Sequence, residues 1–466
     1  MTEDREPTTD ATSAVQEHRA ENGAPRKESN LGVASYILYN FGNTPFALTI
    51  LTLYFPLWLT EEYGAGPALY NYATSVASLL VVLIAPVLGA LCDLHQRRRR
   101  YLVVLTLITV LFTLGLSGSY DITGSLFVTL VCFVVAVVAY QLINVPYFAL
   151  LPSVAKGRGT GTISGYTQAA GFIGTLLATL GFVFFVTPEK FFGFSVGGPQ
   201  HIRQQFSHLG SWIDTSTASV DSNTFLPTAA FFLLFALPAF FFVPDRPQRA
   251  PQPAKLVEAY RSVLTTLRHI RAYVGLGTYM VVTLLFMDAA SIAIPNMCIF
   301  AKNIFGMGDG QISNLMAFSL IFSILAAFGA GRISDKVGPK RTLLATLGLW
   351  IVAILAIMFA WAPWVFFVTG PLLFLAFGAT IALGPVLLIA LSPSESLTEF
   401  MGFFVTVGQV SAALGPVILG LLLGMLGGLE TGVAYRIAIG SLAVTMVVGL
   451  FLLLRVPDVR PPDARA

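Results

Sequence analysis

The chain has 466 residues, of which 55% are hydrophobic and 11% charged, and its formal net charge is +3 at pH 7. Soluble domains carry about 25% charged and about 45–50% apolar residues, so this composition excludes an ordinary soluble protein and indicates an integral membrane protein. The three cysteines have neither metal nor disulfide spacing, so we expect no metal site and no disulfide framework.

The first 30 residues are polar and acid-rich, and no basic stretch followed by an apolar one occurs there. We therefore expect a disordered cytoplasmic tail at 1–30 rather than a cleaved signal peptide. A helix needs about 20 apolar residues to cross a bilayer. Twelve such windows follow, at 31–60, 67–91, 101–119, 123–150, 160–187, 223–243, 273–300, 311–331, 342–361, 364–391, 399–428 and 431–454. Polar and apolar residues do not alternate within them, which favours helices over barrel strands.

The basic residues lie mainly on one side of these windows. Twelve spans place both termini on the same side, and the tails and loops of that side hold 23 of the 27 Lys and Arg residues. Loops on the cytoplasmic side are enriched in basic residues, so we expect both termini in the cytoplasm.

Two connections between the windows are long. Residues 188–223 are expected outside, as a plain loop, a lid or a surface helix. Residues 244–272 begin with a proline-rich break and then predict an amphipathic helix on the inner membrane surface. Its apolar residues are Leu256, Tyr260, Val263, Leu264, Leu267 and Ile270. This linker divides the chain into six-helix bundles at 31–243 and 273–455, with a short cytoplasmic tail at 456–466.

One unusual string occurs twice. GALCDLHQRRRR begins at Gly89, and GRISDKVGPKR begins at Gly331, 242 positions later. Nearly the same offset, 241 positions, separates Gly161 from Gly402, which indicates an internal duplication. Parallel repeats of six helices are a transporter architecture with the substrate site near the midplane. The sequence therefore predicts an all-α integral membrane protein with twelve transmembrane helices in two pseudo-symmetric six-helix bundles.

Each copy of the string falls in the cytoplasmic loop between the second and third helices of its half. Its glycine allows close helix contact, and its acid can face the positive N-terminus of a neighbouring helix or pair with the basic cluster. Such a contact is a latch, made in one conformation and broken in another; the alternative is simple anchoring of a basic loop. The candidate gating residues are Gly89, Asp93, Arg97, Arg98, Gly331, Asp335, Lys340 and Arg341.

Asp288, near the centre of the seventh window, is the only charged residue expected deep in the membrane. Charge is costly in hydrocarbon, and an ionisable residue there marks a functional site by default. A carboxyl in that position can take up and release protons as a cavity opens and closes. We therefore predict a coupling or binding role for Asp288; the alternative is a structural aspartate at a helix contact.

Uncharged polar residues at mid-span are the candidates for substrate binding. Asn40 and Asn43 share one helix face, and Pro45 permits local unwinding beside them. Gln168 and Gln409 are matched by the repeat. The full set of substrate-binding candidates is Tyr36, Tyr39, Asn40, Asn43, Gln141, Asn144, Gln168 and Gln409. The alternative for these polar groups is hydrogen bonding between helices.

The sequence lacks the motifs of several kinds of functional site. No phosphate-binding Gly-x-x-x-x-Gly-Lys-Ser/Thr loop occurs, so ATP is not expected to be the energy source, and all five histidines lie in tails or loops. No Lys or Arg lies deep in a window, so a polyanion would lack a counter-charge. We expect no catalytic residue, no cofactor and no nucleic-acid partner. The expected partners are a zwitterionic, neutral or cationic small solute, protons and the lipid bilayer, with the chain acting as a monomer.

The strings GALCDLHQRRRRYL and GRISDKVGPKRTLL resemble the loop motif of the major facilitator superfamily, with Gln96 in place of the usual glycine in the first copy. In that superfamily the acid holds the cytoplasmic gate shut while the outside is open, so the resemblance implies this role for Asp93 and Asp335. A narrower resemblance is to the vacuole-effluxer (autophagy-related amino-acid exporter) branch and its bacterial relatives. It rests on YILYNFGNTPFA, APVLGALCD, GTISGYTQAAGFIG and LLFMDAASIAI, with Asn40 where that branch commonly has an aspartate.

The resemblance implies a secondary active transporter of the bacterial inner (plasma) membrane. It would move an amino-acid-like or similar metabolite by alternating access, coupled to protons and in the direction of export. The first helix also resembles that of sugar–cation symporters. A sugar–cation symporter and an exporter of amphiphiles, lipids or drugs therefore remain alternatives, and a non-transporting membrane receptor is the alternative from another class.

Overall fold

A computed structural model describes residues 29–64, 67–186, 225–245, 256–268 and 273–459, apart from 274, 427 and 429. Within these residues the regular secondary structure is entirely helical. The expected N-terminal tail up to residue 28 and the connection at 188–223 lie outside the described residues.

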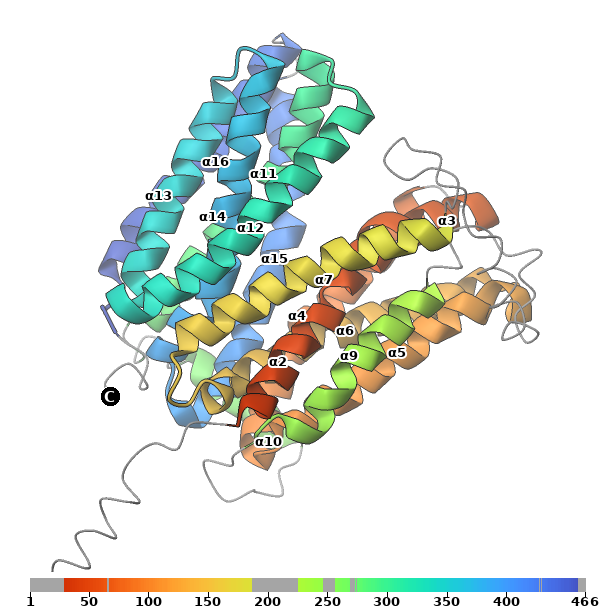
Figure 1. Ribbon diagram of the computed structural model, residues 1–466, viewed down its shortest axis with the longest axis vertical. Coiled ribbons are helices and arrows are strands. Elements are labelled where there is room, and N and C mark those ends of the chain that lie inside the picture. Colours follow the sequence, from red (N-terminus) through yellow and green to blue (C-terminus); the bar gives the residue numbers. More distant parts are fainter. Residues whose placement is uncertain are drawn as a thin grey trace, which may run out of the picture.

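The helices that precede the linker pack together as one group (Figure 1). They are α2 (Asn30–Asn43), the π-helix η1 (Ala47–Tyr54), α3 (Phe55–Tyr63), α4 (Pro67–His95), α5 (Arg98–Thr123), α6 (Leu126–Val154), α7 (Thr160–Val186) and α9 (Phe225–Phe242). The helices that follow the linker form the second group. They are α11 (Leu276–Phe305), α12 (Asp309–Val337), α13 (Pro339–Met358), the short η4 (Pro363–Val365), α14 (Phe366–Leu391), the short η5 (Ser394–Ser396), α15 (Leu397–Met425) and α16 (Thr431–Arg455).

The two groups of helices meet at one end and diverge toward the other, as α7 and α12 do in Figure 1. The end where they meet carries the loops that follow Asp93 and Asp335, and we call it the basic end. The other end is called the distal end.

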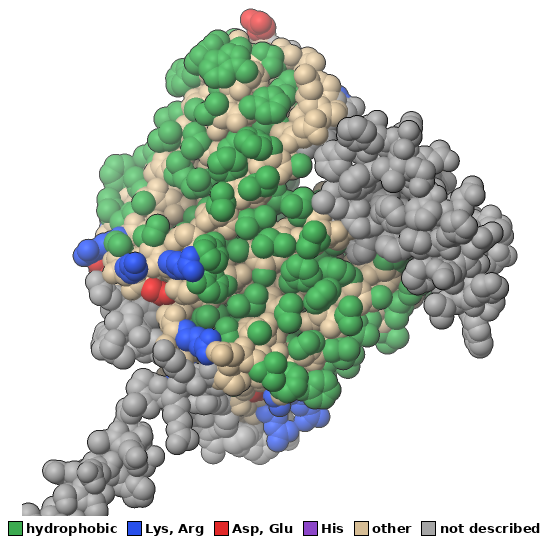
Figure 2. Space-filling model, viewed as in Figure 1, with side chains coloured by type: hydrophobic (Ala, Val, Ile, Leu, Met, Phe, Trp, Pro, Cys, Tyr) green, Lys and Arg blue, Asp and Glu red, His purple; other side chains and the backbone are tan. Residues whose placement is uncertain are grey.

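Ten of the described helices are long and apolar enough to cross a membrane. They correspond to ten of the twelve expected windows, and the first and fifth windows correspond to the stretch from α2 to α3 and to α7. The outer surface is apolar, and Leu79, Leu111, Leu325 and Phe451 are each more than 60% exposed. Figure 2 shows one such face, with Lys and Arg gathered toward one end of it. A surface this apolar belongs in lipid, because soluble monomers rarely expose large apolar patches.

The first span contains a π-helix and does not unwind at Pro45. The carbonyl oxygen of Asn40 accepts hydrogen bonds from the backbone N–H of Thr44 at 3.0 Å and from the Thr44 hydroxyl at 2.8 Å. The Thr49 hydroxyl donates to the carbonyl oxygen of Pro45 at 2.9 Å. Carbonyls near the proline are therefore satisfied inside the helix. Segments of π-helix are rare and occur frequently at functional sites.

The linker contains the expected helix, α10 (Leu256–Arg268), which packs against α4 at the basic end. Ala259 and Val263 are buried, whereas Tyr260 and Leu264 are half exposed, so only part of the predicted apolar stripe faces the protein. The exposed part is free to contact the membrane surface. Ile270, the last residue of the predicted stripe, lies outside the described residues.

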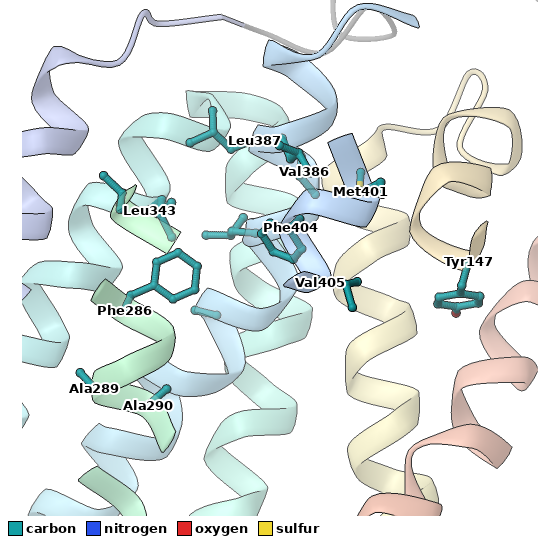
Figure 3. Packing of buried hydrophobic residues seen from close by; sticks show 14 of the residues in the cluster. Tyr147, Phe286, Ala289, Ala290, Leu343, Val386, Leu387, Met401, Phe404 and Val405 are labelled. Atoms are coloured by element: carbon teal, nitrogen blue, oxygen red, sulfur yellow. The ribbon is translucent and has the colours of Figure 1, made fainter. Parts of the chain in front are cut away.

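The apolar core is continuous across the basic half of the molecule. Figure 3 shows Phe286 of α11 and Phe404 of α15 packed among buried side chains of α13 and α14, with Tyr147 of α6 on the other side of the interface. Phe404 meets Phe148 edge to face, with ring centroids 6.5 Å apart. Burial of these rings holds the two groups together near the basic end, because the rings exchange contacts with water or lipid for close packing against side chains of the opposite group.

Candidate functional site: two seams and a buried carboxyl

The contact between α4 and α15, called the first seam, is centred on Asp93. Its carboxylate forms an ion pair with the buried Arg98 at 3.0 Å. It also accepts hydrogen bonds from the Thr398 hydroxyl at 2.6 Å and from the backbone N–H of Glu399 at 2.8 Å. Thr398 and Glu399 stand in the first turn of α15, where the unpaired N–H groups and the helix dipole favour a negative charge. Asp93 therefore binds one group of helices to the other.

Glycines allow the two backbones of the first seam to touch. A Cβ atom added at Gly89 would lie 2.3 Å from the carbonyl oxygen of Thr398, and one added at Gly402 would lie 2.4 Å from that of Ala85. Backbone atoms cannot move aside as a flexible side chain can. The first seam consequently closes only with glycine at these positions, as expected for small residues at a helix–helix contact in a membrane.

The contact between α7 and α12, called the second seam, is centred on Asp335. Its carboxylate accepts hydrogen bonds from the backbone N–H groups of Gly161 and Thr162 at 2.8 and 2.7 Å, and a further one from the Thr162 hydroxyl. Gly331 lies against Gly161, where an added Cβ would come 2.3 Å from the carbonyl oxygen. The second seam thus repeats the pattern of the first, with an acid on a helix N-terminus and a glycine beside it.

The basic residues of the two strings do not act alike. Arg98 is buried in the first seam, but Arg97 is exposed. Lys340 donates to the carbonyl oxygen of Leu454 at 3.0 Å, and Arg341 forms an exposed ion pair with Asp458 at 2.9 Å. The contacts of Lys340 and Arg341 therefore lie within one group of helices and do not involve Asp335.

The tripeptide Val-Pro-Asp, which our sequence reasoning missed, ends both the sixth and the twelfth spans. In the first copy Asp245 accepts a hydrogen bond from the backbone N–H of Arg99 at 2.8 Å, at the start of α5. Burial raises the pKa of the Asp245 carboxyl, although this hydrogen bond and the charges of nearby arginines oppose the shift. In the second copy Asp458 binds Arg341. The repetition of the tripeptide could have identified Asp245 and Asp458 as a matched pair from the sequence alone.

The two prolines of this tripeptide are also matched. Pro244 packs against Gly32 at the start of α2, and Pro457 packs against Gly275 at the start of α11. Each Val-Pro-Asp copy therefore fastens the last helix of its half to the first and third helices of the same half. These fastenings stay within a group of helices, whereas the seams join the two groups.

Tyr36 and Tyr39 are fully buried among the helices before the linker. Tyr36 and Tyr147 each donate a hydroxyl hydrogen bond to the other's carbonyl oxygen, at 2.9 and 3.0 Å, and their rings stack with centroids 4.3 Å apart. The hydroxyl of Tyr39 is 2.6 Å from that of Thr106. These contacts hold α2 to α5 and α6, and they occupy both hydroxyls that we predicted to meet substrate.

The two asparagines of the first span differ. Asn40 donates from Nδ2 to the carbonyl oxygen of Thr167 at 2.9 Å and so joins α2 to α7. Asn43 is buried, and its Oδ1 atom has no hydrogen-bond partner within the described part of the chain. An unpartnered buried amide oxygen is costly unless a ligand or water satisfies it. Asn43 is therefore the stronger binding candidate of the pair.

The four remaining amide candidates lie on three helices. On α6, Asn144 donates from Nδ2 to the backbone oxygen of Gln141 at 3.3 Å, and both residues are partly buried. Gln168 on α7 is buried, and Gln409 on α15 is partly buried. α7 and α15 are the helices that carry the N-termini bound by Asp335 and Asp93. A solute held by these glutamines would therefore act on the same helices that the seams fasten.

Asp288 lies within α11 and faces α15. A Cβ atom added at Gly415 of α15 would lie 2.4 Å from the Oδ1 atom of Asp288, so this glycine makes room for the carboxyl. Oδ1 is buried and has no hydrogen-bond partner among the described residues. Beside it, the Ser411 hydroxyl donates to the carbonyl oxygen of Leu284 at 3.0 Å and fixes the two helices together. A carboxyl in this setting lacks the partner that an ionised group needs in an apolar environment.

Two matched groups of membrane-spanning helices, joined at one end by acid-to-helix contacts, define a helical membrane carrier. Residues 4–179 and 279–466 match the family model of the Major Facilitator Superfamily, and the chain belongs to this superfamily. It is accordingly a multi-pass integral membrane transporter and not an enzyme.

The chain is 19% identical over 436 residues to the uncharacterized MFS-type transporter YxiO of Bacillus subtilis, covering 92% of this chain and 95% of that protein. Among solved structures it resembles the human organic anion transporter MFSD10, with a TM-score of 0.67 at 16% identity, covering 91% and 99% of the two chains. It also resembles the transporter FucP in the outward conformation, with a TM-score of 0.67 at 14% identity, covering 91% and 97%. At these identities the structural likenesses concern the fold alone.

Proposed function

We propose that this transporter works by alternating access, with the two seams as its cytoplasmic gate. The basic residues of the tails and loops indicate that the basic end faces the cytoplasm of a bacterial cell. In the present conformation both seams are made and the groups of helices diverge toward the distal end, which corresponds to an outward-open state (Figure 1). Breaking the contacts of Asp93 and Asp335 would let the two bundles, 31–243 and 273–455, rock toward the opposite state.

Asp288 is the proposed coupling residue, and its unpartnered oxygen is the observation that carries the proposal. The carboxyl lies between α11 and α15, and α15 is also the helix that Asp93 binds at the basic end. A proton that neutralises Asp288 removes the cost of a lone charge at the helix contact. Loss of that proton favours a conformation in which water or a cationic solute reaches the carboxyl. Protonation of Asp288 and closure of the first seam are thereby linked through one helix.

The proposed substrate is a small zwitterionic, neutral or cationic solute, with amino acids as the first class to test. The partly buried and buried candidates offer an acid and several amides, and in the described spans Lys and Arg stand only near helix ends. An amide oxygen such as that of Asn43 can accept from an ammonium or hydroxyl group, and Asp288 can balance one positive charge. A polyanion finds no balancing charge at that depth.

The experiment is a flux measurement in proteoliposomes that contain the full-length protein. Amino acids, sugars and amphiphilic cations are offered with and without a pH gradient, to wild type and to Asp288→Asn. We expect the gradient to drive net flux in the wild type and not in Asp288→Asn, which should retain exchange of substrate for substrate. Asp458→Asn, which removes an exposed carboxylate near the basic end, serves as the matched control and should respond as wild type does.

Three outcomes contradict different parts of the proposal. If the gradient leaves wild-type flux unchanged, the transporter is not proton-coupled. If Asp288→Asn still responds fully to the gradient, coupling does not run through Asp288. Flux of amphiphiles without any response to amino acids or sugars would replace the proposed substrate class by that of a drug or lipid exporter.

A further inference from the structure

One guanidinium at the second seam lies over aromatic rings from both groups of helices. The Cζ atom of Arg332 on α12 is 3.9 Å from the ring centroid of Phe328 and 5.1 Å from that of Tyr166. Tyr166 belongs to α7, and its ring stacks on Phe328 with centroids 4.8 Å apart. Arg332 therefore covers a ring pair that exists only while α7 and α12 are together.

Arg332 keeps its hydrogen-bond donors available. Its side chain is exposed, and within the described part of the chain it makes no hydrogen bond or ion pair. Stacking uses the flat face of a guanidinium and leaves its in-plane N–H groups free. Those groups have the fork geometry that binds phosphate through two parallel hydrogen bonds.

The surroundings of Arg332 are those of a lipid headgroup layer. On the same helix, Leu325, Ile333 and Val337 are 61%, 51% and 44% exposed, which provides a surface for acyl chains. The exposed Lys336 follows one turn after Arg332. In Figure 2 basic side chains of the molecule lie where the apolar face ends. A guanidinium at this depth meets phospholipid phosphates, and the cytoplasmic leaflet supplies anionic ones.

The first seam has no equivalent of this arrangement. By the repeat offsets, Arg332 corresponds to Ala90, Phe328 to Pro86 and Tyr166 to Val407. There α10 packs against α4 instead, and the Ser262 hydroxyl of α10 donates to Glu399 of α15 at 2.9 Å. The protein thus bridges its first seam with its own linker helix. At the second seam the corresponding position carries a free basic group that faces lipid.

We propose that the phosphate of an anionic phospholipid binds Arg332 on the Phe328–Tyr166 ring pair and stabilises the closed second seam. The lipid does there what α10 does at the first seam. Because the ring pair comes apart when α7 leaves α12, the lipid binds the closed seam better than the open one, and it shifts the population toward the closed state. This proposal does not depend on the substrate or on proton coupling.

The first test counts retained lipids. Full-length protein in micelles that contain phosphatidylglycerol and phosphatidylcholine is analysed by native mass spectrometry, as wild type, Arg332→Gln and Lys336→Gln. If the lipid is held only by general attraction to basic residues, removing one such residue weakens binding about fivefold, and equally in both variants. A built site predicts a loss of phosphatidylglycerol of tenfold or more in Arg332→Gln only. Equal losses in the two variants overturn the proposal.

The second test measures the conformation. The native cysteines are replaced, and spin labels are placed at Arg100 and Val337, exposed positions of opposite groups at the basic end. In nanodiscs, phosphatidylglycerol should raise the closed fraction of wild type and of Tyr166→Phe, which keeps the ring. It should not do so in Tyr166→Leu or Arg332→Gln, and soluble glycerol phosphate should have no effect in phosphatidylcholine discs. The proposal is overturned if phosphatidylglycerol does not change the closed fraction of wild type, or if it raises the closed fraction of Tyr166→Leu as much as that of wild type.

Discussion

The first and second seams come from one duplicated pattern, yet their acids are held in different ways. Asp93 has a helix N-terminus and a buried arginine as partners, whereas Asp335 is held by two backbone N–H groups and one hydroxyl of α7. The first seam is also linked to the linker helix through Ser262 and Glu399. The duplication therefore fixed the helix-to-acid contact and the glycines, and the two halves then diverged in what surrounds them.

This difference separates the essential part of a gate from its adjustable part. The shared part is an acid at the N-terminus of a helix from the opposite bundle, with glycines that let the backbones touch. The charge on Arg98, the linker contact and the exposed Arg332 are present on one seam only. We therefore expect matched glycine substitutions to weaken either seam alike, whereas changes that involve Arg98, the linker contact or Arg332 should affect one seam only.

The largest expected effect is that of Asp93→Ala compared with Asp335→Ala. Removing Asp93 leaves the buried Arg98 without its counter-ion, which costs about 3–5 kcal/mol for a buried pair. Asp335→Ala loses three hydrogen bonds to α7 and Asp93→Ala loses two to α15, each worth about 1.5–3 kcal/mol because the acceptor is charged, but only Asp93→Ala also leaves a buried cation unpaired. Thermal denaturation of the purified variants should rank Asp93→Ala as the less stable.

The double variant Asp93→Ala with Arg98→Met is the control for this explanation. It removes the stranded charge as well as its partner, so it should recover much of the stability that Asp93→Ala loses. If the double variant is as unstable as the single one, the ion pair is not the source of the difference between the seams.

The next effect concerns the glycines, where the two seams should behave alike. In Gly331→Ala the new Cβ meets the backbone oxygen of Gly161, and overpacking of this kind costs about 1–3 kcal/mol in the closed state. Gly329→Ala is a matched control on the same helix, because an added Cβ there meets nothing within 4 Å. The spin-label distance at the basic end should lengthen in Gly331→Ala and in Gly89→Ala, but not in Gly329→Ala. A closed seam in both glycine variants would mean that backbone contact is not required.

The sequence predicted the shared part of the gate because the repeat displays it. Gly89, Asp93, Gly331 and Asp335 stand at one offset, and the family resemblance gave the acids their role. The sequence named both Arg97 and Arg98 among the four consecutive arginines and could not decide between them. That choice depends on where α5 begins, which turns Arg98 into the seam and leaves Arg97 exposed.

Other parts of the site were hidden from the sequence for identifiable reasons. Tyr36 has a hydroxyl that could line a cavity, and so it was a candidate for substrate binding. Packing decides which face of a helix turns toward its own bundle, and the structure turns the Tyr36 hydroxyl to α6. The second Val-Pro-Asp tripeptide was missed because Asp245 and Asp458 are 213 positions apart. The long connection at 188–223 shifts the register between the halves, so the offset of the seams does not find this pair.

An effect of similar size, but confined to the first seam, is expected from the contact of that seam with the linker helix. Ser262→Ala removes the hydrogen bond to Glu399, worth about 1.5–3 kcal/mol when the acceptor is charged and less when it is neutral. Hydrogen exchange of α10 should become faster, with little change in α12. Thr265→Ala is the control, because that hydroxyl bonds to Arg261 within α10 itself. Equal acceleration in both variants would show that Ser262 does not fasten the helix.

The smallest effects belong to the Val-Pro-Asp copies, which fasten each bundle internally. Asp458 forms an exposed ion pair with Arg341, and such pairs contribute about 0.2–1 kcal/mol. Asp245 is partly buried and accepts the Arg99 N–H at the start of α5, so Asp245→Ala should cost more, about 0.5–2 kcal/mol as for a helix cap. Thermal denaturation compares the two. Equal costs would mean that burial does not distinguish the copies.

The contribution of Asp245 to the stability of the folded protein depends on pH. Because burial raises the pKa of Asp245, the folded protein holds its proton more tightly than the unfolded chain does. The stabilisation from that proton is complete below the unfolded pKa and is lost as pH rises through the folded one. Above the folded pKa the ionised carboxylate carries the burial cost, so at such pH Asp245→Asn, which keeps an oxygen acceptor and no charge, should cost less stability than Asp245→Ala. An Asn variant as unstable as the Ala variant would require the negative charge itself at the start of α5.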